Sequence, residues 1–415
     1  FMKKFIKLFA IAACLAAVVS CVKDNTGNGE EPTEPKKLTD LVIPAGFDWK
    51  TIDDIQCNFA SVSYATRVSL FYTSDCLDNT QIADLYITPE YKNFKISVSK
   101  ALTQIYMKYQ QQGGEYKIIP VPLANPLNIV VPSDSKKLDN VSNLTKGFAG
   151  STNNSMIRVR GTMFFEDMYP NLGDYDFNDY AFTYDHIANI NSGNISSMEL
   201  YFQVLCIGGT LPYELYVRLK GVKTSDVTDV QVFVQKGELL SVRKVDATNP
   251  NDDCILSVTG IPEKVKSQKP KESKLYNTEK GQINKKLVIQ TPTVIITLKS
   301  GVKYTGGDMY DMFLGGEIKD ITGTSYREIH DKDNSSSWLI KNVNEKVDSY
   351  VDSKGFVWAI KVAPDDRYLN YGIPYPYEYV GILDAYPGFA NWIITKGQDQ
   401  SWVKSMNTEK VAILK

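Results

Sequence analysis

The part of the sequence richest in side chains that could do chemistry is the stretch from Glu166 to Asp179. Five acidic residues and two asparagines fall within these fourteen positions, and aromatic residues stand among them. Carboxylates at this density repel one another unless a cation or a set of backbone donors compensates their charge. Ca²⁺ suits such a set best, because it accepts about six to eight oxygen ligands in a flexible geometry. The sequence therefore predicts a calcium site here.

An EF-hand does not fit this stretch, although four residues fall on the first, third, fifth and twelfth positions of such a loop: Asp174, Asp176, Asn178 and Asp185. The sixth position requires glycine and holds Asp179, and Tyr180–Tyr184 has the pattern of a strand where a helix should begin. The alternative to a calcium site is an acidic turn, in which aspartate side chains accept hydrogen bonds from nearby backbone amides.

Carboxylates could also act in a glycan hydrolase, for which the candidate pairs are Glu166 with Asp174 and Glu378 with Asp384.

Only two histidines are present. His186 follows a predicted strand and His330 lies in a polar loop, so we expect neither a Cys/His zinc site nor a hydrolase with several catalytic histidines. We expect a protein without enzymatic activity.

The N-terminal residues have the pattern of an export signal. Three lysines precede an almost unbroken apolar run from Leu8 to Val19, which is too short to serve as a mature membrane span. The run ends in Val18-Val19-Ser20-Cys21, which resembles the lipobox of bacterial lipoproteins. On that resemblance we expect residues 1–20 to be a signal peptide, cleaved before Cys21, whose thiol carries the lipid.

The segment after Cys21 has the composition of a tether. Residues 23–37 contain no apolar side chain apart from proline, so they have nothing to bury, and we expect residues 21–40 to be disordered. No later stretch is long and apolar enough to cross a bilayer. Removing residues 1–20 leaves 395 residues with a net charge of about −5, which argues against a nucleic-acid partner.

Alternating apolar residues predict a first β region over residues 41–140, a small antiparallel sandwich of the immunoglobulin-like kind. The alternating sets are Ile55, Cys57 and Phe59; Val68, Leu70 and Tyr72; Phe94, Ile96 and Val98; and Ile105, Met107 and Tyr109. A Gln-Gln-Gly-Gly turn then leads into a strand at 116–121. Cys57 and Cys76 could form a local disulfide, but Cys57 and Cys206 lie in apolar runs, so we expect buried thiols.

The polar stretch 133–154 separates this region from a second one, over residues 150–415, in which strands resume at once. The expected strands cover 157–165, 180–184, 198–206, 214–220, 230–234 and 287–298, with Pro292 marking an edge or a bulge. We expect residues 264–286 to form a long exposed loop, and 379–385 and 392–395 to form short helices. The fold class is thus mainly β, with antiparallel sandwich domains.

Several motifs, in order, resemble those of the LruC-domain lipoproteins, which are common in Bacteroidetes. The acidic stretch resembles the family's hallmark, and the later matches are Arg327–His330, Trp358–Ile360, Tyr375–Glu378 and Asp384–Phe389. The opening Ile43–Trp49 is also similar to what precedes the domain in these proteins. One departure is Tyr180-Ala181-Phe182, which stands where the family usually has an aliphatic run.

The resemblance implies an envelope or surface lipoprotein of unknown activity, and a calcium site with the ligands Asp167, Asp174, Asp176 and Asp179. We therefore expect a lipid-anchored binding or adhesion protein at the outer membrane or cell surface, whose partner is a glycan or a host or envelope protein. The alternatives are the glycan hydrolase above and a structural subunit of a surface filament or complex, which would use the loop at 264–286 and the edge near Pro292.

The lipid anchor gives the first testable prediction. Cys21→Ser removes the only thiol at the expected cleavage site, so the protein should still be exported but should lose radioactive palmitate label and leave the membrane fraction. Undiminished labelling of the Cys21→Ser protein would contradict the anchor.

Overall fold

The alternation of apolar and polar residues produces a mainly β fold, as predicted. The computed structural model describes residues 37–138, 153–234, 238–246, 249–320, 323–337 and 347–414. The predicted signal peptide, Cys21 and most of the tether lie outside the described residues. No helix within the described ranges is long and apolar enough to span a membrane.

The first β region packs two sheets face to face. One has the order β4-β1-β7, with β1 (Ile52–Ala60), β4 (Asn93–Ser99) and β7 (Leu127–Val130). The other has the order β3-β2-β5-β6, with β2 (Thr66–Phe71), β3 (Gln81–Ile87), β5 (Gln104–Gln110) and β6 (Tyr116–Pro122). The alternating residues named above fill one apolar core between the sheets, which confirms a sandwich. The sandwich is not purely antiparallel, because β1 and β7 pair in parallel.

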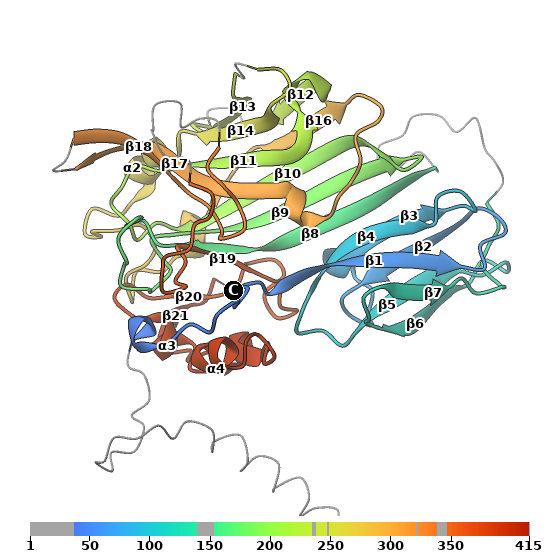
Figure 1. Cartoon of the computed structure of the whole chain (residues 1–415), viewed down its shortest axis with the longest axis horizontal. Coiled ribbons are helices and arrows are strands. Elements are labelled where there is room, and N and C mark those ends of the chain that lie inside the picture. The colour runs from blue at the N-terminus through green and yellow to red at the C-terminus, as the bar shows by residue number, and fades with distance from the viewer. Residues whose placement is uncertain are drawn as a thin grey trace, which may run out of the picture. The chain divides into compact units, whose positions relative to one another are not determined.

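The second of these sheets continues past the polar stretch at 139–152. β3 pairs with β8 (Asn154–Phe165) at Ala83↔Ile157 and Asp84↔Met156. β8 is followed in the sheet by β9 (Tyr180–Asn191), β10 (Asn194–Cys206), β16 (Thr293–Leu298) and β12 (Val227–Phe233), which run side by side in Figure 1. β15 (Ile289–Gln290) pairs with β10, and β19 (Ala359–Val362) pairs with β8. One sheet therefore crosses the predicted boundary between the two domains. The division into two domains stays a prediction.

A five-stranded sheet packs over part of this large sheet. Its order is β13 (Ser241–Lys244), β14 (Asp253–Thr259), β11 (Glu214–Lys223), β17 (Tyr310–Asp320) and β18 (Gly323–Ile329). Leu215, Val217, Met312 and Leu314 of this sheet share one core with Phe182, Phe202 and Val204 of the large sheet. Burying each such side chain contributes roughly 1.5–3 kcal/mol, so this core fixes the two sheets together.

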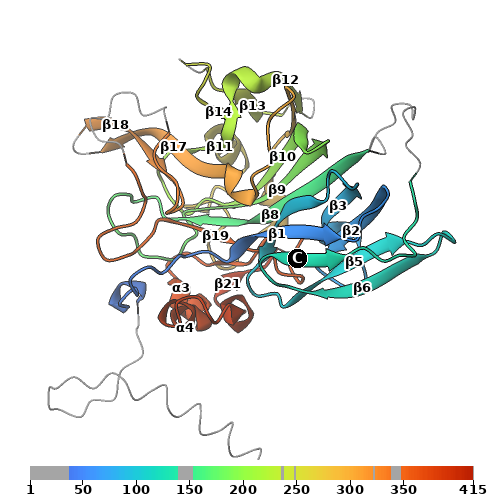
Figure 2. The same cartoon turned by 45° about the vertical axis from the view of Figure 1, so that its right-hand side comes forward.

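The C-terminal segment closes the other face of the large sheet, below β8 and β19 in Figures 1 and 2. It contains β20 (Tyr375–Pro376), α3 (Ile382–Ala385), α4 (Gly388–Ile394) and β21 (Val411–Ala412). Its aromatic rings meet rings from the N-terminal segment: Trp392 lies 4.9 Å from Phe47 and 5.9 Å from Trp49 between ring centroids. The chain's first and last described segments therefore share a core.

The remaining elements are short. α2 (Ile261–Gln268) follows β14, and six 3₁₀ helices are η1 (Leu38–Asp40), η2 (Asp78–Thr80), η3 (Thr224–Asp226), η4 (Lys285–Leu287), η5 (Gly307–Met309) and η6 (Ser401–Ser405) in the described part of the chain. Cys57, Cys76, Cys206 and Cys254 are free and buried; for Cys57 and Cys206 this is the predicted state.

One of two local predictions was wrong, and the other was confirmed in one of its alternatives. Residues 264–286 are not one exposed loop, because α2 covers their start and Tyr276, Asn277 and Thr278 are buried against the body. Pro292 marks a bulge, as predicted, and not an edge: it separates β15 from β16, which both pair with β10, and the four steps from Gln290 to Val294 oppose only three on β10, from Gln203 to Leu200. Proline lacks an amide hydrogen, so the ladder breaks at this position.

His330, predicted in a polar loop, is instead fully buried between two carboxylates. Its Nδ1 lies 2.9 Å from Asp311 and its Nε2 lies 3.0 Å from Glu328, while Arg218 pairs with Asp311 at 2.7 Å. Burial opposes the charged imidazolium, but the carboxylates outweigh burial and raise the pKa of His330 to about 9. His186, in contrast, is buried away from carboxylates, and burial lowers its pKa to about 3.

The raised pKa of His330 predicts a loss of stability in alkali. An unfolded histidine titrates near pH 6.5, so the stabilisation from charged His330 is complete below about pH 6.5 and is lost as the pH rises through about 9. His330→Gln should lower the free energy of unfolding by a few kcal/mol at pH 6, and the difference from wild type should shrink toward pH 9.

Denaturant melts of both proteins between pH 6 and 9 measure this difference. His186→Gln is the matched control: folded His186 is neutral throughout that range, so its difference from wild type changes only below about pH 7.5, where the unfolded histidine gains a proton, and should stay constant from there to pH 9. A constant difference for His330→Gln as well would contradict a charged histidine.

Candidate functional site

The acidic stretch forms the loop between β8 and β9. Phe165 and Tyr180 are register partners, so the chain leaves and rejoins the sheet at the same place. Within the loop Tyr175 and Phe177 have left-handed backbones, with φ of 57° and 54°, and both rings are buried in the C-terminal core. This conformation is unfavourable for residues other than glycine, so the burial of the two rings must stabilise it.

Two carboxylates of the loop, Glu166 and Asp176, are buried together with those rings. Glu166 is fully buried and accepts hydrogen bonds from the amides of Tyr175, at 3.1 Å, and Phe177, at 2.7 Å. Asp176 accepts from the amides of Asn178 and Tyr379, both at 3.1 Å. The predicted acidic turn, with carboxylates capping amides, is therefore part of what the loop does.

Three carboxylates converge in this loop. One oxygen each from Glu166, Asp174 and Asp176 lies within 4.8 Å of the others, a spacing that could hold a metal ion. Burial raises the pKa of Glu166 well above its usual value, and the charges of Asp179 and Asp176 raise it further. Burial likewise raises the pKa of Asp176 to about 8, with Asp174 adding to the effect.

Asp167 and Asp179 form a second carboxylate pair on the same loop. The amide of Asp167 donates to Asp179 Oδ2 at 2.8 Å, and burial, followed by the charge of Asp167, raises the pKa of Asp179 to about 9. Of the four ligands that the resemblance implied, the structure thus brings Asp174 and Asp176 together with Glu166, and it places Asp167 and Asp179 beside them as a coupled pair.

Two further oxygens near this cluster are buried without a hydrogen-bond partner: Asn178 Oδ1 and Glu378 Oε2. Asn178 is fully buried, and its Nδ2 donates to the carbonyl of Pro376 at 3.2 Å, which fixes the direction of Oδ1. A Cβ at Gly208 would stand 2.1 Å from Asn178 Oδ1 and 2.9 Å from Glu378 Oε2, so both oxygens lie beside the same point. Each unsatisfied acceptor costs about 1–3 kcal/mol.

Within the described ranges, no ion pair compensates the negative charge of this cluster. Among the ion pairs of the described residues, none involves Glu166, Asp167, Asp174, Asp176, Asp179 or Glu378. Burial raises the pKa of Glu378 to about 7, and the charge of Asp174 contributes to the rise. We call these six carboxylates together with Asn178 the acidic cluster. Its oxygen-only composition fits a hard cation.

The acidic cluster is reached from solvent through Asp174, the exposed member of the set. Asp174 lines a cavity of about 530 Å³, together with Lys37, Tyr379 and Asp384. Tyr379 is 78% exposed and its backbone is left-handed, with φ of 62°. The cavity therefore gives a solute access to the cluster and to an exposed aromatic ring.

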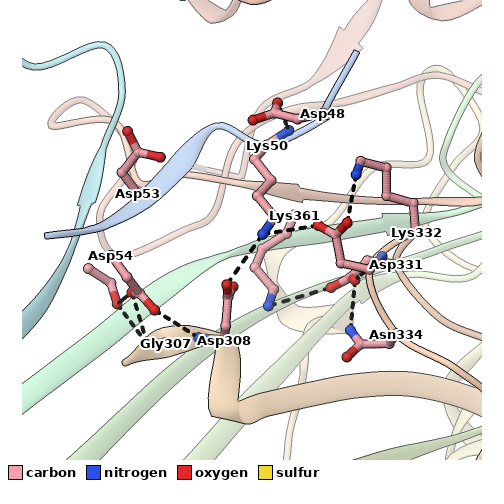
Figure 3. Close-up of polar contacts among 12 residues, drawn as sticks. Asp48, Lys50, Asp53, Asp54, Gly307, Asp308, Asp331, Lys332, Asn334 and Lys361 are labelled. Atoms are coloured by element: carbon pink, nitrogen blue, oxygen red, sulfur yellow. Dashed lines mark hydrogen bonds and ion pairs between the residues drawn. The ribbon is translucent and has the colours of Figure 1, made fainter. Parts of the chain in front are cut away.

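A second polar site lies where the N-terminal segment crosses the sheet (Figure 3). Lys50 lies 3.3 Å from Asp308 and 3.0 Å from Asp333, and Lys361 lies 3.6 Å from Asp331. These groups line a cavity of about 150 Å³. Because their charges compensate one another, we interpret this site as the attachment of the N-terminal segment, in contrast to the uncompensated acidic cluster.

Sequence reasoning found the acidic loop but not all of its partners. Glu166 was not among the implied ligands, although it stands next to Asp167 in the same motif. Glu378 comes from a segment about two hundred residues later; its place in the motif Tyr375–Glu378 and the candidate pair with Asp384 singled it out, but neither indicated that it lies beside the acidic loop. Asn178 lies inside the motif, but no sequence signal indicates that its Oδ1 is unsatisfied.

The comparisons with known proteins concern the family and the fold. The model of a family described as a domain of unknown function (DUF4842) matches residues 193–402, which is just over half of the chain. No curated protein matches the sequence. The matched segment includes Gly208 and Glu378, whereas the acidic loop precedes it.

One solved structure shares the fold. It is that of a Bacteroides ovatus protein provisionally described as a lipoprotein, with a TM-score of 0.62 and 18% identity over 84% of this chain and 100% of that one. A further match, the major pilin subunit BcpA of Bacillus cereus, has a TM-score of 0.14 and 8% identity over 76% of this chain and 96% of that one. That score is too low to support any argument.

The space beside Gly208 gives a test of the acidic cluster's packing. Gly208→Ala places a methyl group against Asn178 Oδ1 and Glu378 Oε2, so it should destabilise the protein by about 1–3 kcal/mol. Gly381→Ala is the control, because nothing lies within 4 Å of its Cβ position and its stability should change by less than about 0.5 kcal/mol. Equal melting temperatures for the two variants would contradict the close approach at Gly208.

Proposed function

This chain belongs to the DUF4842 family, whose function is unknown, and we propose that it is a lipid-anchored binding protein of the cell envelope, braced by a calcium ion in its acidic cluster. The observation that carries the calcium site is the pair of unsatisfied buried oxygens, Asn178 Oδ1 and Glu378 Oε2, beside carboxylates that form no ion pair with any described residue. A single cation would satisfy the oxygens and relieve the repulsion together.

The donor set favours calcium over other metals. It contains carboxylate and amide oxygens and a solvent-facing side for water, which suits the flexible coordination of Ca²⁺. Magnesium requires a tighter octahedron and releases its waters reluctantly. Zinc prefers nitrogen and sulfur ligands, and the one thiol beside the cluster, Cys206, has a pKa that burial raises well above its usual value, which keeps it from acting as a thiolate.

A cation here would join segments that are distant in sequence. Asp174, Asp176 and Asn178 belong to the β8–β9 loop, Glu378 follows β20, and the space between them borders the turn after β10 at Gly208. The amide of Tyr379 already donates to Asp176 across the same junction, at 3.1 Å. The cation would therefore fasten the C-terminal segment to the end of the central hairpin.

The envelope location rests on the sequence and on the shared fold. The lipobox at Cys21 and the tether after it are those of an exported, lipid-anchored chain, and the Bacteroides ovatus protein with this fold is itself provisionally described as a lipoprotein. The binding role rests on the cavity at Asp174 and Tyr379, where an exposed aromatic ring lies next to a cation site. A glycan or an envelope protein remains the partner that we propose.

Calcium should raise the melting temperature. Extracellular calcium modules bind with Kd of about 0.1–1 mM. Calcium at tenfold its Kd stabilises a native-state binder by roughly 1.4 kcal/mol, which is a shift of a few degrees in a protein of this size. A chelator should reverse the shift, and magnesium should produce less of it.

Variants locate the site. Glu378→Gln and Asp174→Asn should abolish the calcium shift, and they should leave the calcium-free melting temperature unchanged or raised because each removes one repelling charge. Asp384→Asn is the control: Asp384 lines the same cavity but pairs with Lys410 at 3.0 Å, so the shift should persist. If calcium leaves the wild-type melting temperature unchanged, only the acidic-turn interpretation remains.

A further inference from the structure

The outer face of the central sheet carries two rows of polar side chains across β8, β9 and β10. The register of the three strands aligns these residues: Arg160, Asp185 and Tyr201 in one row, and Thr162, Thr183 and Gln203 in the next. Side chains alternate along a strand, so both rows lie on one face, opposite the apolar residues of the core. This face forms the floor of a pocket.

The segment at 364–373 forms a wall beside this floor. The amide of Ile373 donates to Thr162 Oγ1 at 3.0 Å, and the Cβ position of Gly372, where φ is 76°, lies 2.4 Å from Thr183 Cγ2. A side chain at Gly372 would therefore force the wall away from the sheet. Floor and wall enclose a cavity of about 210 Å³, which Tyr368 and Asn370 also line.

The pocket has one positive charge in excess. Arg158 and Asp185 form a bidentate pair, with Nε 2.6 Å from Oδ1 and Nη2 bonded to Oδ2, and thereby neutralise each other. Arg160 remains, with a side chain that is only 7% exposed. It also forms an ion pair with Asp185, whose Oδ2 lies 3.6 Å from the buried Nε and beyond hydrogen-bonding distance, so two guanidinium groups share one carboxylate. Its Nη1 donates to the carbonyl of Asn79.

The other floor residues offer neutral hydrogen-bonding groups. Gln203 Nε2 donates to the Tyr201 hydroxyl at 3.1 Å, and Thr183 Oγ1 donates to Gln203 Oε1 at 3.3 Å. The Tyr201 hydroxyl accepts in this chain, so its proton remains available to a ligand. A carboxylate beside Arg160 and hydroxyls above Tyr201 and Gln203 would match this arrangement of charge and donors.

We propose that this pocket binds an acidic sugar of the hexuronate class, with the carboxylate on Arg160 and the ring hydroxyls on Tyr201 and Gln203. Its volume is below the ~300–1,000 Å³ of pockets for drug-sized ligands, so it holds one sugar ring. The site is separate from the acidic cluster and does not require calcium. It would give the envelope protein an acidic glycan as its ligand.

The test uses pairs of sugars that differ only at C6. D-galacturonate and D-glucuronate carry a carboxylate where D-galactose and D-glucose carry a hydroxymethyl group. Titrations followed by protein NMR or calorimetry should give saturable binding of at least one hexuronate and at least tenfold weaker binding of its neutral counterpart. Acetate and sulfate are included to separate an acidic-sugar site from a general anion site.

Arg160→Gln should weaken hexuronate binding at least tenfold, whereas Arg243→Gln, which removes the same charge from β13, should leave it unchanged. Tyr201→Phe removes only a hydroxyl and should weaken binding severalfold, so it keeps the test decisive if Arg160→Gln fails to fold. The proposal is overturned if neither hexuronate binds, if galactose or sulfate binds as tightly, or if Arg160→Gln or Tyr201→Phe binds hexuronate like wild type.

Discussion

β8 and β9 pair without a bulge over twelve positions, from Asn154↔Asn191 to Phe165↔Tyr180, and the position of every candidate site depends on this pairing. One end of the hairpin projects the acidic loop toward the C-terminal segment. The outer face of the same hairpin presents Arg160 and its row, and the inner face carries the core shared with the five-stranded sheet. If β8 slipped by one residue relative to β9, its polar side chains would point into the core. The burial of the inner face therefore specifies the register.

Buried charges are arranged differently around His330 and in the acidic cluster. Around His330 each charge has a partner of opposite sign within hydrogen-bonding distance, so the charges of this network are compensated without a ligand. In the acidic cluster, Asp176 and its neighbours are buried together with Tyr175 and Phe177, and no ion pair among the described residues compensates them. The first arrangement is what a purely structural role requires, while the second is the one to which we assign the proposed cation.

The sequence predicted several strands where a pattern is local, but it did not predict β3, β14 or β17, which are seven to eleven residues long. The alternation of Ile55, Cys57 and Phe59 identified β1, and the acidic loop could be read from one contiguous motif. β7 was not predicted because its four residues are too few to show an alternation of apolar and polar residues. Glu378 and the wall at 364–373 could not be placed, because what brings them to Asp176 and Thr162 is tertiary packing across about two hundred residues of chain. The burial of His330 was not predicted for the same reason: its neighbours in the sequence are polar and indicate an exposed loop.

The shared core of the first and last segments has a consequence for the order of folding. Trp49 Nε1 donates to the carbonyl of Gly355 at 2.9 Å, across 306 positions of sequence, and its ring packs on Trp392. Until residues near 392 have emerged, the indole of Trp49 has no place to be buried. For the exported chain that we propose, this delay would keep the core from closing prematurely, because α4, which carries Trp392, follows almost all of the sheet strands in the sequence.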